Sequence, residues 1–242
     1  MIRFFTNPGN ISKNQIKLSD EDTKHIRSLR LRPGEEFIVC DGAETDYVCK
    51  LSADDIEGMA EILRQEKTHA EPKIHATIYI AYAKGDRLNY AVQKAVELGA
   101  KAIVLFRSKR CIAVPDNTSN KTERLCKIAY EAAKQSGRGV IPTVKDGGNF
   151  KAIIDTAIRE NALAIMLFED ENTTHLKEVL EQPGNKQTVA IISGPEGGFE
   201  ASEAKAAKEI GIQTVSLGPR ILRSETAPIA TLSALMYHTN NL

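Results

Sequence analysis

The 242-residue sequence lacks several features that would assign it to a special class of protein. Its four cysteines, Cys40, Cys49, Cys111 and Cys126, show no Cys-x-x-Cys spacing, which argues against a zinc site and against a disulfide framework. No apolar run approaches the roughly 20 residues of a membrane-spanning helix, and the residues after Met1 turn polar too early for a signal peptide. We therefore expect a metal-free, soluble protein of a reducing cytoplasm, with one large domain or two smaller ones.

The chain also lacks a net charge, but its basic residues are unevenly distributed. Residues 84–138 contain twelve Lys or Arg and only five acids, a formal charge of +7. A second basic segment, Lys24–Arg32, contains no acid. Local positive charge of this kind is typical of proteins that bind a phosphate backbone. Ordinary solvated helix faces are the alternative, and charge alone does not decide between them.

The first 70 residues read as a small β-rich domain, and residues 74–242 as a second domain. In the first domain, Ser19 precedes an acidic first turn and predicts the start of a helix that runs towards Leu29. Asp41 and Gly42 form a turn dipeptide. The strands expected here are 2–5, 37–40, 47–51 and 59–63. A small β-barrel that presents the basic segment would suit RNA binding.

The second domain alternates between strand and helix patterns, after a polar linker at 66–73. The expected strands are 74–81, 102–106, 163–168, 189–192 and 214–217. The expected helices are 88–98, 123–135, 150–159, 200–210 and 228–237. Such alternation predicts a mostly parallel sheet with helices on both faces.

Two loops near the end of the chain stand out. Gly194–Phe199 follows the apolar run 189–192, and Leu217–Pro228 follows the short strand at 214–216. Loops after parallel strands are where open α/β sheets bind ligands, and glycine lets the backbone approach a small molecule closely. Neither loop has the spacing of a phosphate-binding P-loop or of a dinucleotide fingerprint. A structural turn is the alternative for the first loop alone, but the second loop adds arginines, an acid and a Pro-started helix.

These two loops resemble the RsmE family of small-subunit ribosomal RNA methyltransferases, which belong to the SPOUT class. Two segments upstream are also similar to family motifs, namely Gln93–Gly99 and Glu131–Arg138. His25–Gly34 with Asp41 and Gly42 resembles the N-terminal PUA-like domain of the family. The resemblance covers the whole chain.

The resemblance implies an α/β fold in which a SPOUT trefoil-knot domain follows a PUA-like β-barrel. It further implies a homodimer that uses S-adenosyl-L-methionine to methylate N3 of a uridine in 16S ribosomal RNA of the small subunit. The cofactor should be held by backbone groups of three loops. The residues expected to bind it are Leu167, Phe168, Ile192, Ser193, Gly194, Gly197, Gly198, Leu217, Gly218, Ile221, Leu222, Arg223, Thr226 and Ala227.

Given that reaction, the chemistry assigns candidate roles to a few charged residues. Uridine N3 is a weakly acidic imide nitrogen, so a general base would assist its attack, and Glu225 or Glu196 could serve. Charge then develops on the flanking oxygens, where Arg223 or Arg138 could stabilise it. The structural alternative for Glu196 is a loop carboxylate that bonds nearby amides.

For RNA, the base must be unpaired or flipped out, while cations hold the backbone phosphates. The RNA-binding residues predicted are Arg27, Arg30, Arg32, Lys84, Lys94, Arg110 and Arg138. For Arg220 the alternative to a functional role is a structural or dimer contact, and for His25 it is packing at a helix end. Two other function classes stay open: an RNA-binding assembly factor without activity, and, less favoured, a nucleotide-dependent oxidoreductase.

Overall fold

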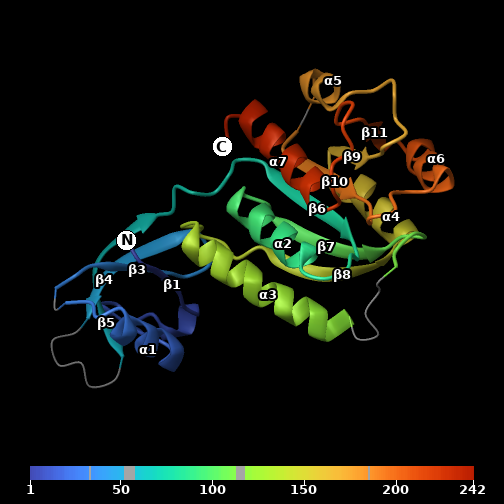
Figure 1. Ribbon diagram of the computed structural model, residues 1–242. Coiled ribbons are helices and arrows are strands. Elements are labelled where there is room, and N and C mark those ends of the chain that lie inside the picture. Colours follow the sequence, from blue (N-terminus) through green and yellow to red (C-terminus); the bar gives the residue numbers. More distant parts are fainter. Residues whose placement is uncertain (33, 52–57, 113–117, 185) are drawn as a thin grey trace. The chain divides into compact units, whose positions relative to one another are not determined.

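A computed structural model describes residues 1–32, 34–51, 58–112, 118–184 and 186–242. The chain forms two compact units (Figure 1). The first comprises Met1–Glu71 together with Ala133–Ile141, and the second comprises Pro72–Ala132 and Pro142–Leu242. Residues 133–141 thus belong to the first unit, although in the sequence they lie between two segments of the second.

The first unit is built on a five-stranded sheet with the order β1-β3-β4-β5-β2. Strand β1 pairs with β3 in parallel, and the other neighbours are antiparallel. Its elements are β1 (Arg3–Phe5), the 3-10 helix η1 (Pro8–Asn10), β2 (Gln15–Lys17), α1 (Asp20–Ser28), β3 (Phe37–Cys40), β4 (Thr45–Leu51) and β5 (Met59–Lys67). Helix α1 closes the core of this unit through Ile26, which packs with Phe4, Ile16 and Phe37.

Three predictions from the sequence of the first unit are confirmed. The Ser19 hydroxyl caps α1 by accepting a hydrogen bond from the Asp22 amide, as the sequence predicts. Asp41 makes the predicted turn between β3 and β4, because its carboxylate accepts from the amides of Ala43 and Thr45. His25 packs edge-on against Phe4, with ring centroids 5.8 Å apart, so its helix-end packing role is confirmed.

The predictions that are wrong in this unit concern strands with few buried residues. Strand β2 was not predicted, because its three residues place only Ile16 in the core. Strand β5 continues to Lys67, beyond the predicted end at residue 63, and its last five side chains are exposed. The predicted linker at 66–73 therefore begins inside a strand. Pairing with β4, rather than burial, holds this end in the sheet.

The second unit is a parallel six-stranded sheet with the order β11-β9-β10-β6-β7-β8. Its strands are β6 (His75–Ala81), β7 (Ala102–Arg107), β8 (Thr143–Asn149), β9 (Leu163–Leu167), β10 (Thr188–Ser193) and β11 (Gln213–Val215). Its helices are α2 (Arg87–Glu97), α4 (Phe150–Glu160), α5 (Leu176–Glu181), α6 (Ala201–Glu209) and α7 (Thr226–His238), and α3 (Thr118–Gln135) follows β7. The predicted parallel α/β sheet is confirmed.

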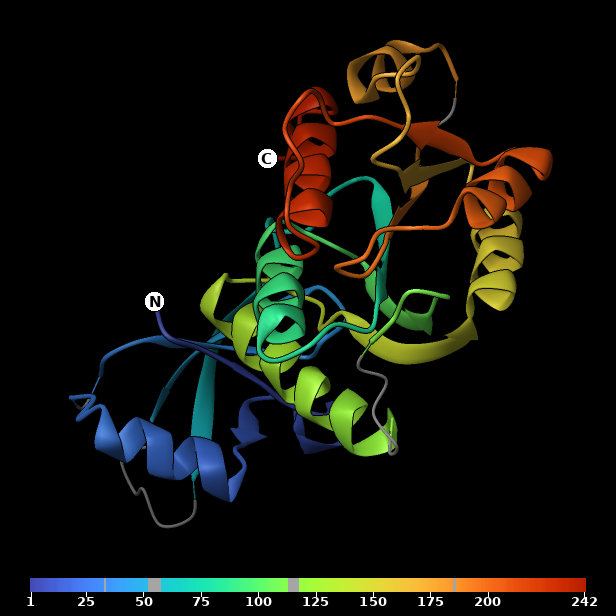
Figure 2. The ribbon, with the colours of Figure 1, turned by 45° about the vertical axis from the view of Figure 1, so that its right-hand side comes forward.

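Helices cover both faces of this sheet. Figure 2 shows α2 and α7 on one side of the strands, and α4 and α6 on the other. The core beneath α4 and α6 contains Tyr79, Phe106, Met166, Ile192 and Phe199, all nearly inaccessible to solvent. Strands buried on both faces need apolar residues at successive positions, which is why the run at 189–192 is continuous rather than alternating.

The sheet order positions the ligand loops. The chain first adds β7 and β8 on one side of β6, and then crosses to the other side for β10, β9 and β11. Such a reversal next to β6 opens a crevice at the carboxyl ends of the strands. Loops that are far apart in sequence, after β9, β10 and β11, therefore meet at one edge.

Three features of this unit were not predicted. The edge strand β8 has no apolar signal because Asp146, Gly147 and Gly148 lie in its second half. The short helix α5 has only two buried residues, Val179 and Leu180. Helix α3 begins at Thr118, five residues before the predicted start.

Glu171, in the turn after β9, is a buried anchor of this unit at 5% exposure. Its carboxylate accepts hydrogen bonds from Lys208 at 2.8 Å, from the Thr214 hydroxyl at 2.6 Å, and from the Thr173 hydroxyl at 2.6 Å. The hydrogen bonds from Lys208, Thr173 and Thr214 hold the pKa of the Glu171 carboxyl far below its usual range. The loop after β9 is thereby tied to both β11 and α6.

We expect Glu171→Ala to lower the free energy of unfolding by about 2–4 kcal/mol, since it leaves buried donors without their charged acceptor. Because the folded pKa is depressed, the stabilisation is complete above the unfolded pKa of about 4.3 and is lost as the pH falls below it. Urea unfolding of both proteins at pH 7 and pH 3.5 measures this. A difference between the two proteins that does not shrink at pH 3.5 would contradict the assignment. Glu181→Ala, at an exposed site on α5, is the control.

Candidate functional site

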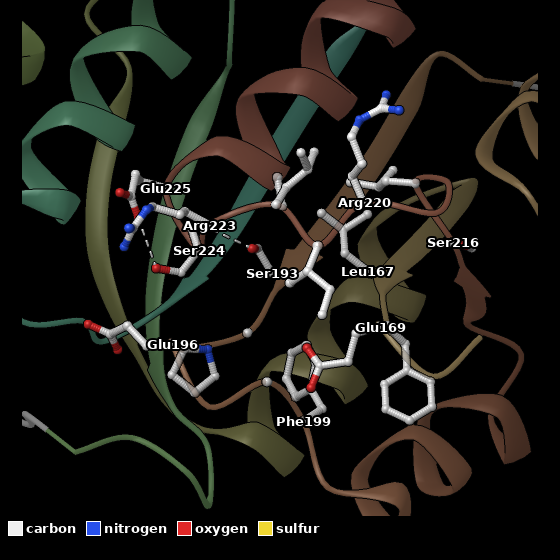
Figure 3. A pocket seen from close by; sticks show the side chains of 18 of the residues that line it. Leu167, Glu169, Ser193, Glu196, Phe199, Ser216, Arg220, Arg223, Ser224 and Glu225 are labelled. Carbon is white, nitrogen blue, oxygen red and sulfur yellow. Dashed lines mark hydrogen bonds between the residues drawn. The ribbon is translucent and has the colours of Figure 1, made fainter. Parts of the chain in front are cut away.

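A cavity of about 320 Å³ lies at the carboxyl ends of β9, β10 and β11 (Figure 3). This is within the usual size range of small-molecule sites. Three loops form its walls: 167–169 after β9, 193–199 after β10, and 215–227 after β11. One further side chain, Arg87, reaches it from the start of α2. Both conspicuous loops of the sequence thus line one cavity.

A tight turn and a buried aromatic ring fix the loop after β10. The Gly198 amide donates to the Pro195 carbonyl at 3.0 Å, which closes a tight turn, and Gly198 adopts φ +65°. Phe199 then inserts into the core, where its ring stacks on that of Phe106. A side chain at Gly194 would press on this ring, because a Cβ there would lie 3.0 Å from it. At Gly194 and Gly198 the loop therefore presents backbone to the cavity.

The loop after β11 leads into α7. The Arg223 carbonyl accepts from the amides of Thr226 and Ala227, both at 2.9 Å, which fixes the last residues before the helix. Ile221 is 88% exposed, an unusual position for a large apolar side chain beside a cavity. Arg220 and Arg223 make no ion pair with any residue within the described ranges, so both guanidinium groups are available to a ligand.

Two carboxylates from different loops share one arginine at the cavity. Arg87 binds Glu196 through its Nη1, and its Nε lies 3.7 Å from Oε2 of Glu225. The Lys84 amide also donates to Glu196, at 2.9 Å. The Ser224 hydroxyl donates to Glu225, at 3.1 Å. Figure 3 shows Glu196, Ser224 and Glu225 on the same side of the pocket.

These contacts stabilise the charged form of the Glu196 carboxyl. Burial raises the pKa of its carboxyl, but hydrogen bonds from the amides of Glu196 and Lys84 and from the Arg87 guanidinium outweigh burial, and the pKa falls below its ordinary value. A carboxylate of lowered pKa is a weaker proton acceptor near neutral pH. Glu196 thus behaves as the amide-bonding loop carboxylate that was the structural alternative for it.

Glu169 lies opposite, directly after Phe168 in the cavity wall. Its carboxylate sits over Gly198 so closely that a Cβ at Gly198 would collide with both carboxylate oxygens. Figure 3 shows Glu169 beside Phe199 at the lower edge of the pocket. No cation in the described part of the chain pairs with it. A free carboxylate of this kind suits hydroxyl or ammonium groups of a ligand.

The structure brings most of the predicted cofactor residues together. Those that line the cavity are Leu167, Phe168, Ser193, Gly194, Gly198, Leu217, Gly218, Ile221, Leu222, Arg223 and Ala227. Three predicted residues do not line it: Ile192 is buried in the core, Gly197 faces Arg110, and Thr226 begins α7. Of the catalytic candidates, Glu196, Arg223 and Glu225 line the cavity.

Arg138, the fourth catalytic candidate, belongs to the first unit and does not line the cavity. Its side chain is 3% exposed, and the guanidinium binds the Glu71 carboxylate at 2.6 and 3.1 Å. Glu71 also accepts from the amides of Gly139 and Val140. A buried bidentate pair of this kind fixes residues 138–140 in the first unit and leaves the guanidinium little freedom to meet a substrate.

The basic stretch 84–138 is less available for phosphate than its charge suggests. Several of its cations are bound internally: Arg87, Lys94, Arg107, Lys109, Arg124, Lys134 and Arg138 all lie within 4 Å of a carboxylate. Arg110 donates to the Gly197 carbonyl at 2.9 Å. In contrast, the predicted RNA-binding residues Arg27, Arg30, Arg32 and Lys84 are at least partly exposed, and their side chains form no ion pair in the described segments.

Sequence reasoning missed three residues that shape the cavity. Arg87 was counted only as one cation of the basic stretch, Glu169 was not considered, and Arg220 stayed ambiguous although it lines the site. The available signal for Glu169 was its place immediately after the apolar strand 163–167. No local signal marked Arg87, because its partners Glu196 and Glu225 lie more than 100 residues away.

Two features are absent from the ranges that the structure describes. Within these ranges, no group of three or more His, Cys, Asp or Glu side chains could hold a metal ion. None of the helices seen there is both long enough and apolar enough to span a membrane.

Comparison with known proteins agrees with this site. Residues 70–236 match the family described as RNA methyltransferase domain, and residues 18–62 match the RNA methyltransferase PUA domain. The fold and the site therefore define an RNA methyltransferase of the SPOUT type with a PUA-like domain, and the predicted α/β fold with these two domains is confirmed.

Full-length relatives define the family more closely. The ribosomal RNA small subunit methyltransferase E of Mesomycoplasma hyopneumoniae is 32% identical, over 96% of this chain and 98% of its own. That of Bacillus subtilis is 30% identical over 96% of both chains. A crystal structure of the enzyme of this name from Neisseria gonorrhoeae, bound to S-adenosyl methionine, is 33% identical, with a TM-score of 0.86 over 98% of this chain and 97% of its own. The chain belongs to the ribosomal RNA small subunit methyltransferase E family, as the motifs predicted.

Proposed function

We propose that this protein methylates N3 of a uridine in 16S ribosomal RNA of the small ribosomal subunit, with S-adenosyl-L-methionine as the methyl donor. From the resemblance to the family, we further propose that this uridine is position 1498 in standard ribosomal RNA numbering. The observation that carries the proposal is the cavity walled by both C-terminal loops, in a chain 33% identical to a methyltransferase whose structure contains that cofactor.

The residues present suit this cofactor. The glycine-rich loop after β10 presents backbone groups, Leu167 and Leu222 supply apolar contacts, and Glu169 offers a carboxylate that could accept from hydroxyl or ammonium groups. When bound, S-adenosyl-L-methionine supplies an electrophilic methyl group on a sulfonium. The chain must orient the uracil, stabilise the charge on its oxygens, and keep water out.

Arg223 is the residue that we assign to charge stabilisation. Removal of the N3 proton spreads negative charge over the two flanking oxygens of uracil, and a fixed guanidinium beside them lowers the barrier. Arg223 lines the cavity and has no ion pair with the residues that the structure describes, whereas Arg138 is bound to Glu71. Glu225 remains the better candidate for the base, because the hydrogen bonds to Glu196 lower the pKa of that carboxyl.

The decisive experiment measures the product. Small subunits that lack the modification are incubated with the protein and cofactor, and the 16S RNA is digested and analysed by mass spectrometry. The proposal predicts one new N3-methyluridine. Cofactor binding without any new methylated nucleoside would leave a binding protein of the same fold, and a different methylated base would refute the assignment to N3.

RNA binding is a separate part of the proposal, as are a homodimer, a cytoplasmic location and a trefoil knot in the second unit. We expect Arg27, Arg30 and Arg32 to contact backbone phosphates from the end of α1. Replacing all three with Glu should weaken RNA binding and reduce the slope of log affinity against log salt by up to about three, roughly one per contact.

The control for this prediction reverses three exposed, ion-paired cations of the second unit, Arg159, Lys177 and Lys205. Both variants lose the same charge, so a general field effect would change both slopes equally. Filter binding at several salt concentrations measures them. Equal slopes in the two variants would remove the segment around α1 from the RNA contact.

A further inference from the structure

Arg87 occupies an unfavourable position for a cation. It is the first residue of α2, whose first turn contains no acid, and the N-cap residue Asp86 binds Asn89 and Arg124 rather than Arg87. The helix dipole places partial positive charge there, so an arginine at this site is disfavoured locally. Such a violation of a local rule points to a role in a site.

The partners of Arg87 indicate that role. Its guanidinium binds Glu196 of the loop after β10 and lies 3.7 Å from Glu225 of the loop after β11. Its side chain is 35% exposed, whereas those of Glu196 and Glu225 are 21% and 17% exposed. One side chain at the start of α2 therefore joins two walls of the cavity.

We propose that Arg87 is a positioning residue that holds the two glycine-rich loops at the spacing needed for cofactor binding, by engaging Glu196 and Glu225 together. The inference rests on the proposed function, since it concerns the same cavity. The planar guanidinium has several donors in a fixed fork and can serve two carboxylates at once, which a lysine ammonium does less well. Glu196 and Glu225 are further fixed by the Lys84 amide and by the Ser224 hydroxyl, so the whole group is preorganised.

Arg87 and Arg223 have different roles in the cavity. The Arg87 guanidinium is engaged by two carboxylates, and so it is not the group that meets developing charge on the substrate. That task is left to Arg223, whose guanidinium has no carboxylate partner in the described residues. Replacing Arg87 should therefore weaken cofactor binding, whereas replacing Arg223 should slow methyl transfer.

The test compares Arg87→Met, Arg87→Lys and Arg159→Met. Arg159 is an exposed arginine of α4 that pairs with Glu160 and lies outside the cavity, so it controls for the loss of one charge and one surface ion pair. We expect Arg87→Met to weaken binding of S-adenosylhomocysteine about tenfold, the scale of one lost charged hydrogen-bonded contact. Arg87→Lys should recover part of the affinity, and Arg159→Met should change it less than twofold. Calorimetry gives the affinities, and urea unfolding shows whether each variant is folded.

Two further readouts separate positioning from other roles. In a double-mutant cycle, Arg87→Met and Glu225→Gln should be non-additive, because each removes the same contact. The KM for RNA should stay within about twofold. A rise in this KM with unchanged cofactor affinity would overturn the proposal and make Arg87 an RNA contact. If Arg87→Met behaves like Arg159→Met, the proposal also fails. If the unaltered protein binds no cofactor, the proposed function itself fails.

Discussion

Arg223→Ala should lower the rate of methyl transfer in a single turnover about 10²- to 10³-fold, the usual loss when a preorganised donor to a developing oxyanion is removed. Cofactor affinity should fall by less than about threefold, because the loop backbone and not this guanidinium holds the cofactor. Rapid-quench experiments, in which enzyme saturated with cofactor is mixed with RNA, give the rate. Calorimetry gives the affinity for the cofactor. The expected pattern is a transition-state effect with little change in the ground state.

Arg220→Ala is the matched comparison for this prediction. Arg220 lies on the same loop, is exposed, and lines the same cavity without an ion pair in the described residues. A loss of rate at least ten times smaller than that of Arg223→Ala is expected, since one guanidinium is assigned to the uracil oxygens. Equal losses in the two variants would instead indicate a general field from the loop. A normal rate in Arg223→Ala would exclude it from catalysis.

The sequence predicts those parts of the fold that depend on neighbouring residues. The apolar run at 189–192 followed by glycines predicts both a buried strand and a ligand loop, and the structure has β10 and a cavity wall there. Ser19 and Asp41 predict a helix start and a turn for the same reason, since their partners lie within four residues. Such signals survive folding because tertiary contacts do not have to create them.

What the sequence cannot predict is which charges neutralise each other. The +7 of residues 84–138 suggests a phosphate-binding surface, yet Arg87, Lys109 and Arg138 are bound by Glu196, Glu200 and Glu71. Each of these pairs joins residues separated by 67 or more positions. Summing charge over a window treats every cation as free, and long-range pairing is a property of the folded chain.

The same dependence on contacts between distant residues explains why strand β8 was not predicted. β8 forms the edge of its sheet with a sequence that includes Asp146, Gly147 and Gly148, and β7 supplies the hydrogen bonds that keep it extended. At Gly147 the lack of a side chain is itself required, because a Cβ would lie 2.5 Å from Val104. In the sequence such glycines indicate a loop, whereas in the fold they permit close packing.

Gly198→Ala should weaken cofactor binding by about tenfold to a hundredfold, on the scale of overpacking in a well-packed site. Gly198 has φ +65°, which alanine adopts only with strain. Its new methyl group would also occupy the space of the Glu169 carboxylate. Glu169 is exposed and can swing away, but it would then leave its place in the cavity wall. The variant therefore changes the lining of the site more than the stability of the fold.

Gly211→Ala separates these two effects. Gly211 has φ +95°, and its nearest neighbour to a Cβ is Ile158 at an ordinary 3.8 Å, so the substitution brings backbone strain without a collision, outside the cavity. Both variants should lose about 1 kcal/mol of unfolding free energy, and only Gly198→Ala should lose affinity for S-adenosylhomocysteine. The double variant Gly198→Ala with Glu169→Ala removes the collision. If it binds as weakly as Glu169→Ala alone, the displaced carboxylate is the cause, and if it binds more weakly still, the methyl group itself blocks the cavity. Full affinity in Gly198→Ala would mean that the cofactor does not approach this turn.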